Sequence, residues 1–115
     1  MKQTPASNDF LLRWKGDTLV VSLAIGAPRK GRAVFRTNLG GASVRRREII
    51  EETEQGVAPL AKAWHDIPMA EKQPGVFSCE VALDEVGVFS GKTCFFPADT
   101  GLPVWPEGAN FHVKV

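Results

Sequence analysis

The feature that most constrains this chain is the alternation of apolar and polar residues in short segments bounded by glycine and proline. In residues 19–25, for example, leucine, valine and isoleucine occupy every second position, so that they share one face of an extended strand. Turn residues such as Gln73-Pro74-Gly75 separate the segments. Short strands at this spacing are typical of an all-β sandwich or barrel. The predicted strands cover residues 10–14, 19–25, 32–37, 64–69, 77–83, 89–95 and 111–115.

Length and charge narrow the possible functions. A chain of 115 residues makes one domain, and a domain of this size buries roughly two-thirds of the surface that its unfolded form exposes. The content of 43% apolar and 23% charged residues is that of a soluble globular protein. The net charge of +1 creates no strong field toward nucleic acid or membrane. No run approaches the ~20 apolar residues of a membrane helix, so we expect neither nucleic acid nor membrane as a partner.

The two ends of the chain suggest its context. Residues 1–8 are polar and carry no apolar core of a secretory signal, which predicts a flexible N-terminus on a cytoplasmic protein, with one domain over residues 9–115. The chain stops inside the predicted strand 111–115, so we expect it to be the first part of a longer protein. Cys79 and Cys94 show neither a disulfide framework nor metal-ligand spacing. We expect both thiols to be reduced, with Cys94 facing outward, and we expect no metal or cofactor.

The link between the strands at 77–83 and 89–95 favours a sandwich. It reads Leu83-Asp84-Glu85-Val86-Gly87-Val88-Phe89, with an acidic residue, a glycine and an aromatic at alternate positions. Immunoglobulin-like sandwiches place a tyrosine where the chain crosses between sheets, and Phe89 would take that packing position without the hydroxyl. An ordinary hairpin is the alternative. The predicted fold is all-β, an immunoglobulin-like (early-set type) β-sandwich of seven to eight short antiparallel strands.

Two tryptophans, a lysine and an asparagine stand out because a β-rich core does not require them. Trp64 precedes an extended segment, and Trp105 lies in a loop flanked by prolines. Lys92 alternates with apolar residues and should point to solvent, and Asn110 should face outward at the start of the last strand. Indole rings stack on the C–H faces of sugars, while Lys92 and Asn110 can hydrogen-bond hydroxyls. The alternative is that both indoles pack under loops, since tryptophan is usually mostly buried.

Other motifs have simpler explanations. The cationic run Arg45-Arg46-Arg47 suggests phosphate binding, but the glutamates within residues 48–54 cancel most of its field, which favours a solvated face or a domain contact. Asp66, Glu85 and Glu107 are candidates for a glycosidase carboxylate pair, but each fits a local structural role. The two histidines have no further ligands at metal-binding spacing. We therefore expect no catalytic residue in this chain.

The order of these residues resembles a known family of glycogen-binding modules. Trp64 stands before Ile67-Pro68-Met69, Lys92 lies in a strand that continues to Phe95, and Trp105 follows a loop that begins at Asp99. This order is similar to modules of the isoamylase N-terminal type, which include the module in the β subunit of AMP-activated protein kinase. In that family a tryptophan, a lysine and a second tryptophan at these positions contact the glucan, and an asparagine near the last strand matches Asn110.

A closer resemblance is to the N-terminal sandwich of bacterial glycogen-debranching-enzyme-like proteins, and it spans nearly the whole chain. The resemblance implies a carbohydrate-binding or accessory domain whose hydrolytic barrel lies downstream. The residues that carry it are Arg36-Thr37-Asn38-Leu39-Gly40, Arg47-Glu48-Ile49-Ile50, Trp64-His65-Asp66-Ile67-Pro68-Met69, Glu85-Val86-Gly87 and Trp105-Pro106-Glu107-Gly108.

The sequence therefore predicts a non-catalytic domain that binds glycogen or starch through Trp64, Lys92, Trp105 and Asn110, as part of a glycogen-debranching or amylase-family glycoside hydrolase. One alternative is a structural sandwich that only packs on the downstream catalytic domain, with Trp105 and Pro106 in the docking face. A generic protein-interaction domain is a third possibility.

Overall fold

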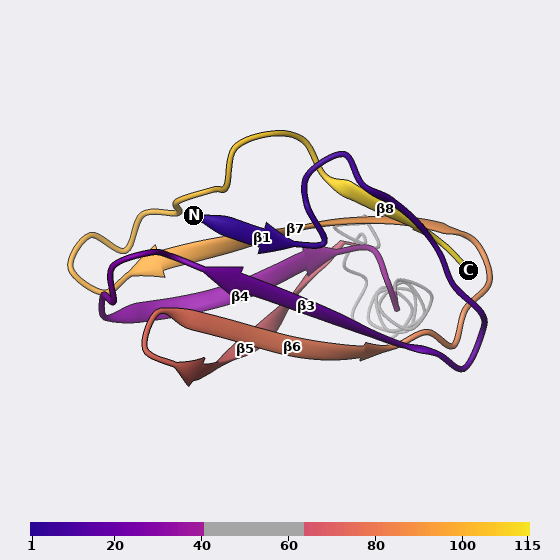
Figure 1. Ribbon diagram of the computed structural model, residues 1–115, viewed down its shortest axis with the longest axis horizontal. Helices are drawn as coiled ribbons and strands as arrows, with labels where there is room; N and C mark the ends of the chain where they lie inside the picture. The colour runs from indigo at the N-terminus through magenta and orange to yellow at the C-terminus, as the bar shows by residue number, and fades with distance from the viewer. Residues whose placement is uncertain (41–63) are drawn as a thin grey trace, which may run out of the picture.

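The computed structural model describes residues 1–40 and 64–115, and these residues form only strands, turns and loops. The all-β class is confirmed for this part of the chain. The cationic run at residues 45–47 lies outside it. Within it, no helix is long and apolar enough to cross a membrane. The strands in Figure 1 are β1 (Lys2–Thr4), β2 (Phe10–Leu12), β3 (Thr18–Ala24), β4 (Gly31–Thr37), β5 (His65–Gln73), β6 (Val76–Ala82), β7 (Val88–Pro97) and β8 (Phe111–Lys114).

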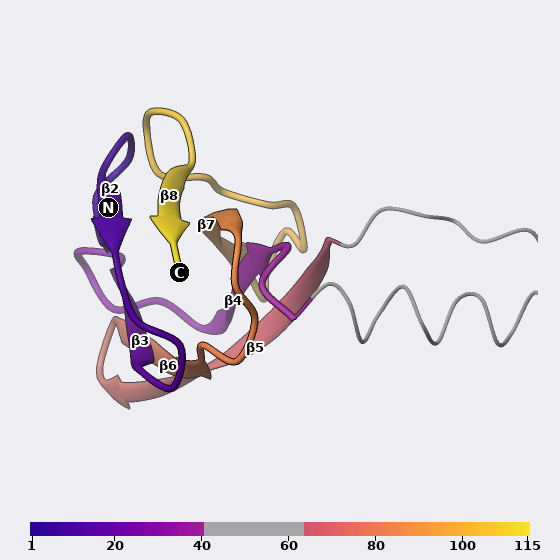
Figure 2. The ribbon, with the colours of Figure 1, turned by 90° about the vertical axis from the view of Figure 1, so that its right-hand side faces the viewer.

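The eight strands of the described residues form one curled sheet in the order β1-β3-β6-β5-β4-β7-β8-β2. Strand β5 joins its two halves, because residues 65–69 pair with β4 and residues 70–73 pair with β6, with a register shift between Glu71 and Gln73. Such irregularities bend a strand and increase its twist. Figure 2 shows the curl, with β7 and β8 across the interior from β3 and β6.

One pairing differs from the prediction of antiparallel strands. Strand β2 runs parallel to β8, with Phe10 opposite His112 and Leu12 opposite Lys114. The other neighbouring strands of the described sheet are antiparallel. A parallel neighbour needs a long connection, and here most of the chain separates β2 from β8. The sequence pattern of two short strands carries no information about such a distant pairing.

The link from β6 to β7 crosses between the two halves of the sheet. These strands are consecutive in the chain but are not neighbours in the sheet. At the crossing Gly87 has a φ of 153°, and a Cβ there would lie 3.2 Å from the ring of the buried Phe89. The predicted crossing is confirmed, and the hairpin alternative is wrong, because β6 and β7 are not paired. Phe89 is buried at the crossing, and its role as the corner residue of an immunoglobulin-like sandwich stays a prediction.

The apolar faces of the alternating strands point into the curled sheet. Phe35 on β4 and Phe111 on β8 are fully buried, and their rings stack with centroids 5.6 Å apart. Gly91 on β7 leaves room for this stack, because a Cβ there would lie 2.3 Å from the Phe35 ring. Burying one such side chain stabilises the fold by about 1.5–3 kcal/mol. The other core residues are Leu19, Val21, Leu23, Ala33, Leu39, Met69, Phe77, Leu83, Phe89, Phe95 and Val113.

Part of the N-terminal segment belongs to the sheet. The flexibility predicted for residues 1–8 stays a prediction. Strand β1 pairs with β3, and Gln3 is buried. The Gln3 amide oxygen accepts hydrogen bonds of 2.8 Å from both the N–H and the hydroxyl of Thr93 on β7. Strand β8 begins only at Phe111, opposite Gly91. Gln3 therefore satisfies a buried backbone group that β8 does not reach, and this bond fixes the segment.

Candidate functional site

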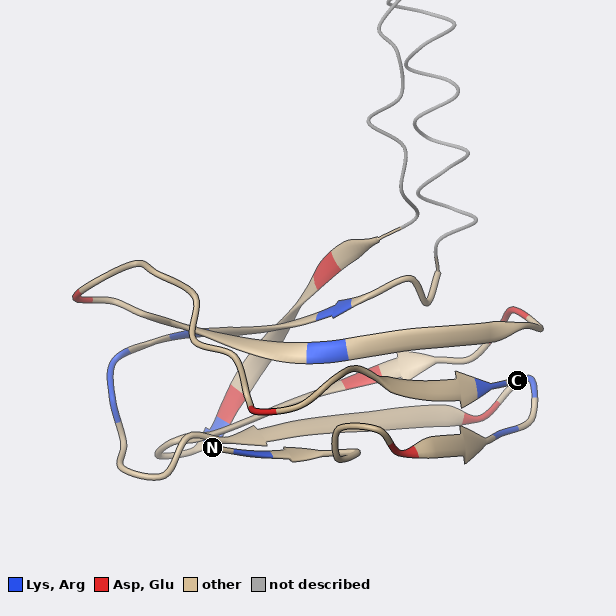
Figure 3. Ribbon diagram, turned by 90° about the horizontal axis from the view of Figure 1, so that it is seen from above, with Lys and Arg blue, Asp and Glu red and all other residues tan. Residues whose placement is uncertain are grey.

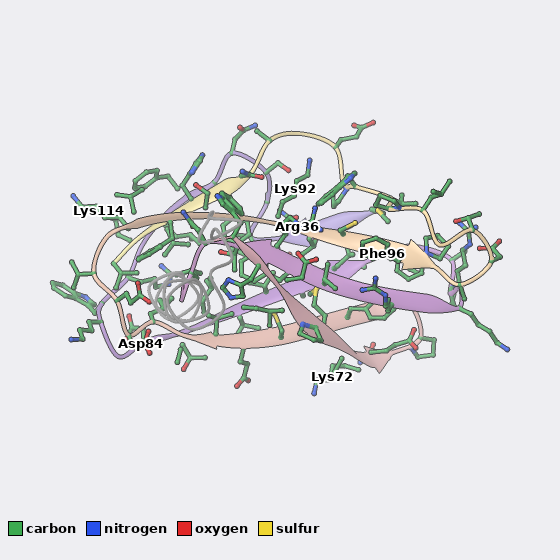
Figure 4. The ribbon with its side chains drawn as sticks, turned by 180° about the vertical axis from the view of Figure 1, so that it is seen from behind. Arg36, Lys72, Asp84, Lys92, Phe96 and Lys114 are labelled. Carbon is green, nitrogen blue, oxygen red and sulfur yellow. The ribbon has the colours of Figure 1, made fainter. Side chains whose placement is uncertain are left out.

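Three neighbouring strands bring candidate residues to one face. Arg36 on β4 lies opposite both Asp66 on β5 and Lys92 on β7. These residues alternate with core residues such as Phe35, so their side chains project from the outer face of the sheet. Figure 4 shows Arg36 and Lys92 side by side on this face. Trp64 directly precedes β5, two positions before Asp66, and the alternation places it on the same face.

Arg36 and Asp66 form a two-pronged ion pair at the centre of this face. Nε of Arg36 donates to Oδ1 of Asp66 at 2.7 Å, and Nη2 donates to Oδ2 at 2.9 Å. The hydrogen bond from Arg36 is the main cause that lowers the pKa of Asp66, and the same bond raises the pKa of Arg36. Both groups are charged at neutral pH. Asp66 is therefore committed to Arg36 as a carboxylate, which is the wrong protonation state for a general acid.

Trp105 is held over this ion pair by a stretch of chain that runs beside β7. Val104 and Phe95 exchange backbone hydrogen bonds of 2.7 and 3.0 Å, which anchor the stretch. The centroid of the indole ring lies 5.2 Å from the guanidinium carbon of Arg36 and 6.0 Å from Nζ of Lys92. These distances are within reach of cation–π attraction. Trp105 remains 39% exposed, so its position is fixed while part of its surface stays open to solvent.

The sequence predicted that Lys92 points to solvent. Its side chain lies on the outer face, but its ammonium group is bonded to the neighbouring loop. Its ammonium group donates a hydrogen bond to the backbone carbonyl of Gly108, and the residue is half-buried. Because Gly108 follows Trp105 in the same loop, this bond ties the loop to β7. Asn110 directly precedes β8, beside Lys92 when the β7–β8 register is extended by one step. It is half-buried, and its carbonyl accepts a hydrogen bond of 3.1 Å from the N–H of Asn8.

Trp64 is 40% exposed. Its Cα lies roughly 7 Å along the strand from that of Asp66, because two residues of a strand span this length. Arg36 lies on the neighbouring strand, about 5 Å to the side. Neither Trp64 nor Trp105 is sealed in the interior. Trp105 lies over the outer face, and alternation along β5 assigns Trp64 to the same face. We call Arg36, Trp64, Asp66, Lys92 and Trp105 the outer-face cluster. Alternation alone could have marked Arg36 and Asp66 as outward, but their pairing depends on the register between β4 and β5.

Cys94 is buried, whereas the sequence predicted an outward thiol. It does alternate with the core residue Phe95, as predicted, but Cys94 is 0% exposed. Burial raises the pKa of the Cys94 thiol and raises that of Cys79 to about 11. Both cysteines are free thiols. Neither has the lowered pKa of a reactive cysteine.

A second exposed surface lies over β2, β8 and the start of β7, and the sequence analysis missed it. Phe10, Leu12, Trp14 and Val88 are 59, 69, 82 and 59% exposed. Leu12 lies opposite Lys114, which lies opposite Val88, so these residues share the outer face at one end of the sheet. We call these four residues the apolar end. Alternation along residues 10–14 placed Phe10, Leu12 and Trp14 on one face, but not whether that face was buried.

Charge is spread over the described surface. Figure 3 shows acidic and basic residues interspersed along the strands and loops. Besides Arg36 and Asp66, Arg29 and Asp99 form an ion pair of 2.9 Å between two loops. The described part of the chain thus carries mixed charge, consistent with the net charge of +1.

Comparison with protein-family models, with curated proteins and with solved structures finds no match for this chain.

Proposed function

We propose that this chain is a non-catalytic α-glucan-binding or accessory domain of a glycogen-debranching or amylase-family glycoside hydrolase, built on an immunoglobulin-like β-sandwich. The observation that carries the proposal is that the exposed indole of Trp105 lies over the Arg36–Asp66 ion pair, while Trp64 is also exposed and belongs to the same face by the alternation along β5. The crossing from β6 to β7 and the curl at β5 support the sandwich. The expected polysaccharide is glycogen or starch.

The outer-face cluster offers what an α-glucan surface requires. A glucan presents apolar C–H faces and a rim of hydroxyl groups. The indoles of Trp64 and Trp105 match the apolar faces, while the guanidinium of Arg36 donates to hydroxyls and the carboxylate of Asp66 accepts from them. Because the ion pair already holds Arg36 and Asp66 in place, little side-chain entropy is lost when a sugar binds.

The energetics favour a polymer over a free sugar. Two rings that each cover about 100 Å² contribute about 5 kcal/mol at ~25 cal/mol/Å². Association costs roughly 4–15 kcal/mol of translational and rotational freedom. A single site therefore binds weakly, and a polysaccharide that presents many copies of the same stretch of glucose units raises the apparent affinity.

Tryptophan emission tests the proposal directly. Trp14 is 82% exposed and lies outside the cluster, so the titration is best made in a Trp14→Phe background that leaves only Trp64 and Trp105 as emitters. Glycogen or a cyclodextrin is expected to quench or shift the emission. Adding Trp64→Ala to this background removes most of the response. Unchanged emission in the Trp14→Phe protein at saturating glycogen contradicts sugar binding.

A second candidate function is a structural sandwich that packs on a catalytic domain of the same protein and binds no ligand. The apolar end favours it, because Phe10, Leu12, Trp14 and Val88 are all more than half exposed and large exposed apolar patches mark interaction sites. The docking face that the sequence suggested, around Trp105 and Pro106, is a weaker choice because Pro106 is buried.

Thermal unfolding separates the two candidates. If the apolar end docks on the catalytic domain, mixing the two raises the Tm of this chain without any sugar. Trp14→Ser then removes the rise, while Trp64→Ser leaves it intact. The reverse pattern, with Trp64→Ser removing the rise, would place the docking face on the outer-face cluster and count against its role in sugar binding.

A further inference from the structure

A groove lies beside Trp105, between the N-terminal segment and the loop that precedes β8. Its volume of about 610 Å³ is in the range of small-molecule sites. Trp105 lines this groove and also belongs to the outer-face cluster, so the two surfaces meet at this residue. The residues that line the groove are Met1, Lys2, Gln3, Ala6, Ser7, Val104, Trp105, Pro106 and Glu107.

Both walls of the groove are fixed by contacts across it. The hydroxyl of Ser7 donates a hydrogen bond of 2.8 Å to the backbone carbonyl of Glu107. The loop packs directly on Ser7, because a Cβ at Gly108 would lie 2.7 Å from the Ser7 Cβ. On the other side, Gln3 holds β1 to Thr93 of β7. A groove whose walls are already tied together needs little rearrangement to accept a ligand.

The side chains of the groove repeat the chemistry of the cluster. Met1 and Trp105 supply apolar surface, while the exposed Lys2 supplies an ammonium donor and the exposed Glu107 a carboxylate acceptor. Apolar surface with isolated donors and acceptors suits a neutral chain of hydroxyl-bearing rings.

We propose that the groove is a second subsite in which a linear stretch of α-glucan continues from the outer-face cluster across Trp105. This inference rests on the proposed function and specifies the ligand, which is a chain of several linked glucose units and not a single sugar or a chain end. The cluster holds the units nearest Trp64 and Trp105. The groove holds the units beyond Trp105, with Lys2 and Glu107 hydrogen-bonded to their hydroxyls.

Calorimetric titration with maltose and maltoheptaose tests the subsite. Ala6 lines the groove and is exposed, and only its backbone groups are bonded, to Asp9. Ala6→Trp therefore fills the groove without removing a hydrogen bond. Ala82→Trp is the matched control, because Ala82 is exposed on β6 and does not line the groove. A longer chain also gains affinity statistically, but that gain is the same in both variants.

The wild type and Ala82→Trp are expected to bind maltoheptaose at least tenfold more tightly than maltose. Ala6→Trp is expected to keep the maltose affinity and to lose most of the preference for the longer chain. Lys2→Met, which removes a donor without adding bulk, is expected to weaken maltoheptaose binding several-fold and to leave maltose unchanged. If Ala6→Trp does not fold, Lys2→Met alone tests the subsite.

The outcomes distinguish the subsite from the function. If the wild type binds both sugars and Ala6→Trp and Lys2→Met keep its preference for maltoheptaose, the groove is not a subsite, while the proposed function stands. If the wild type binds neither sugar but binds glycogen, the subsite is overturned and the proposed function stands. If it binds neither sugar and no glycogen, both proposals are overturned.

Discussion

The outer-face cluster and the apolar end are exposed aromatic surfaces on the same sheet, yet they are built differently. In the cluster, Trp105 is 39% exposed and has two cations within 6.0 Å of its ring. At the apolar end, Trp14 is 82% exposed. Its backbone N–H, and not its indole, donates a hydrogen bond of 2.9 Å to Asp17. Exposure alone therefore does not identify a sugar site. Rings with fixed polar partners suit a hydroxylated ligand, and open apolar side chains suit a protein surface.

The two surfaces also differ in how deeply the residues beneath them are buried. The cluster stands on β4 and β7, whose inner residues Phe35 and Phe95 are 0 and 2% exposed. The apolar end stands partly on β2, a strand of three residues at the edge of the sheet, where Leu11 is only half-buried. Two strands of the cluster thus lie over buried aromatic residues, while the apolar end lies partly over a short strand at the edge of the sheet.

The largest expected effect is on stability, when a residue beneath each surface is truncated. Phe35→Ala is expected to lower the free energy of unfolding by about 3–5 kcal/mol, because it empties the centre of the core. Leu11→Ala removes a half-buried side chain and is expected to cost about 1–2 kcal/mol. Urea unfolding followed by fluorescence measures both values. Equal losses in the two variants would show that β2 is as central to the core as β4.

The next effect compares the two exposed indoles in glycogen binding. Trp105→Ala removes a stacking surface and is expected to weaken binding at least tenfold, which corresponds to about 1.4 kcal/mol. Trp14→Ala is expected to leave the affinity unchanged, because Trp14 lies at the apolar end. Affinity electrophoresis in gels that contain glycogen measures both variants. If Trp14→Ala weakens glycogen binding as much as Trp105→Ala does, the sugar site is not confined to the outer-face cluster.

The smallest effect concerns the ion pair. Arg36 lowers the pKa of Asp66 below its ordinary value of 3.8, so the pair stabilises the folded state above about pH 4, and this contribution is lost as the pH falls through the lowered pKa of Asp66. Both side chains are more than one-third exposed, so the contribution is expected to stay below about 1 kcal/mol. Arg36→Met removes it, and the stability difference from the wild type should shrink below pH 4. A difference that grows on acidification contradicts the assigned pair.

Much of the architecture follows from alternation along the chain. It placed β3, β4, β6, β7 and β8 within a residue or two, and it put Lys92 and Cys94 on the face opposite Phe95. It missed β1, because three residues are too few to show a period. It could not predict that the side chain of Gln3 would accept the hydrogen bond of the Thr93 N–H, which β8 does not reach, since that bond joins distant parts of the chain.

The candidate site was predictable by face but not by contact. Alternation marks Lys92 as outward, but its hydrogen bond to Gly108 depends on the path of the loop at residues 98–110. Alternation also did not predict the burial of Cys94. The Arg36–Asp66 pair depends on the register of β5 against β4. Residue types and spacing indicate which side chains are available, while loop path and strand register decide which of them meet.

The three tryptophans allow one direct test of the central claim, because the chain has no others. Each indole N–H gives its own signal in a nitrogen–proton correlation spectrum, and single Trp→Phe variants assign the signals. On titration with maltoheptaose, the signals of Trp64 and Trp105 are expected to shift together with one dissociation constant, while that of Trp14 stays in place. A spectrum in which only Trp14 shifts, or in which Trp64 and Trp105 titrate with unrelated constants, would contradict a shared α-glucan surface on the outer face.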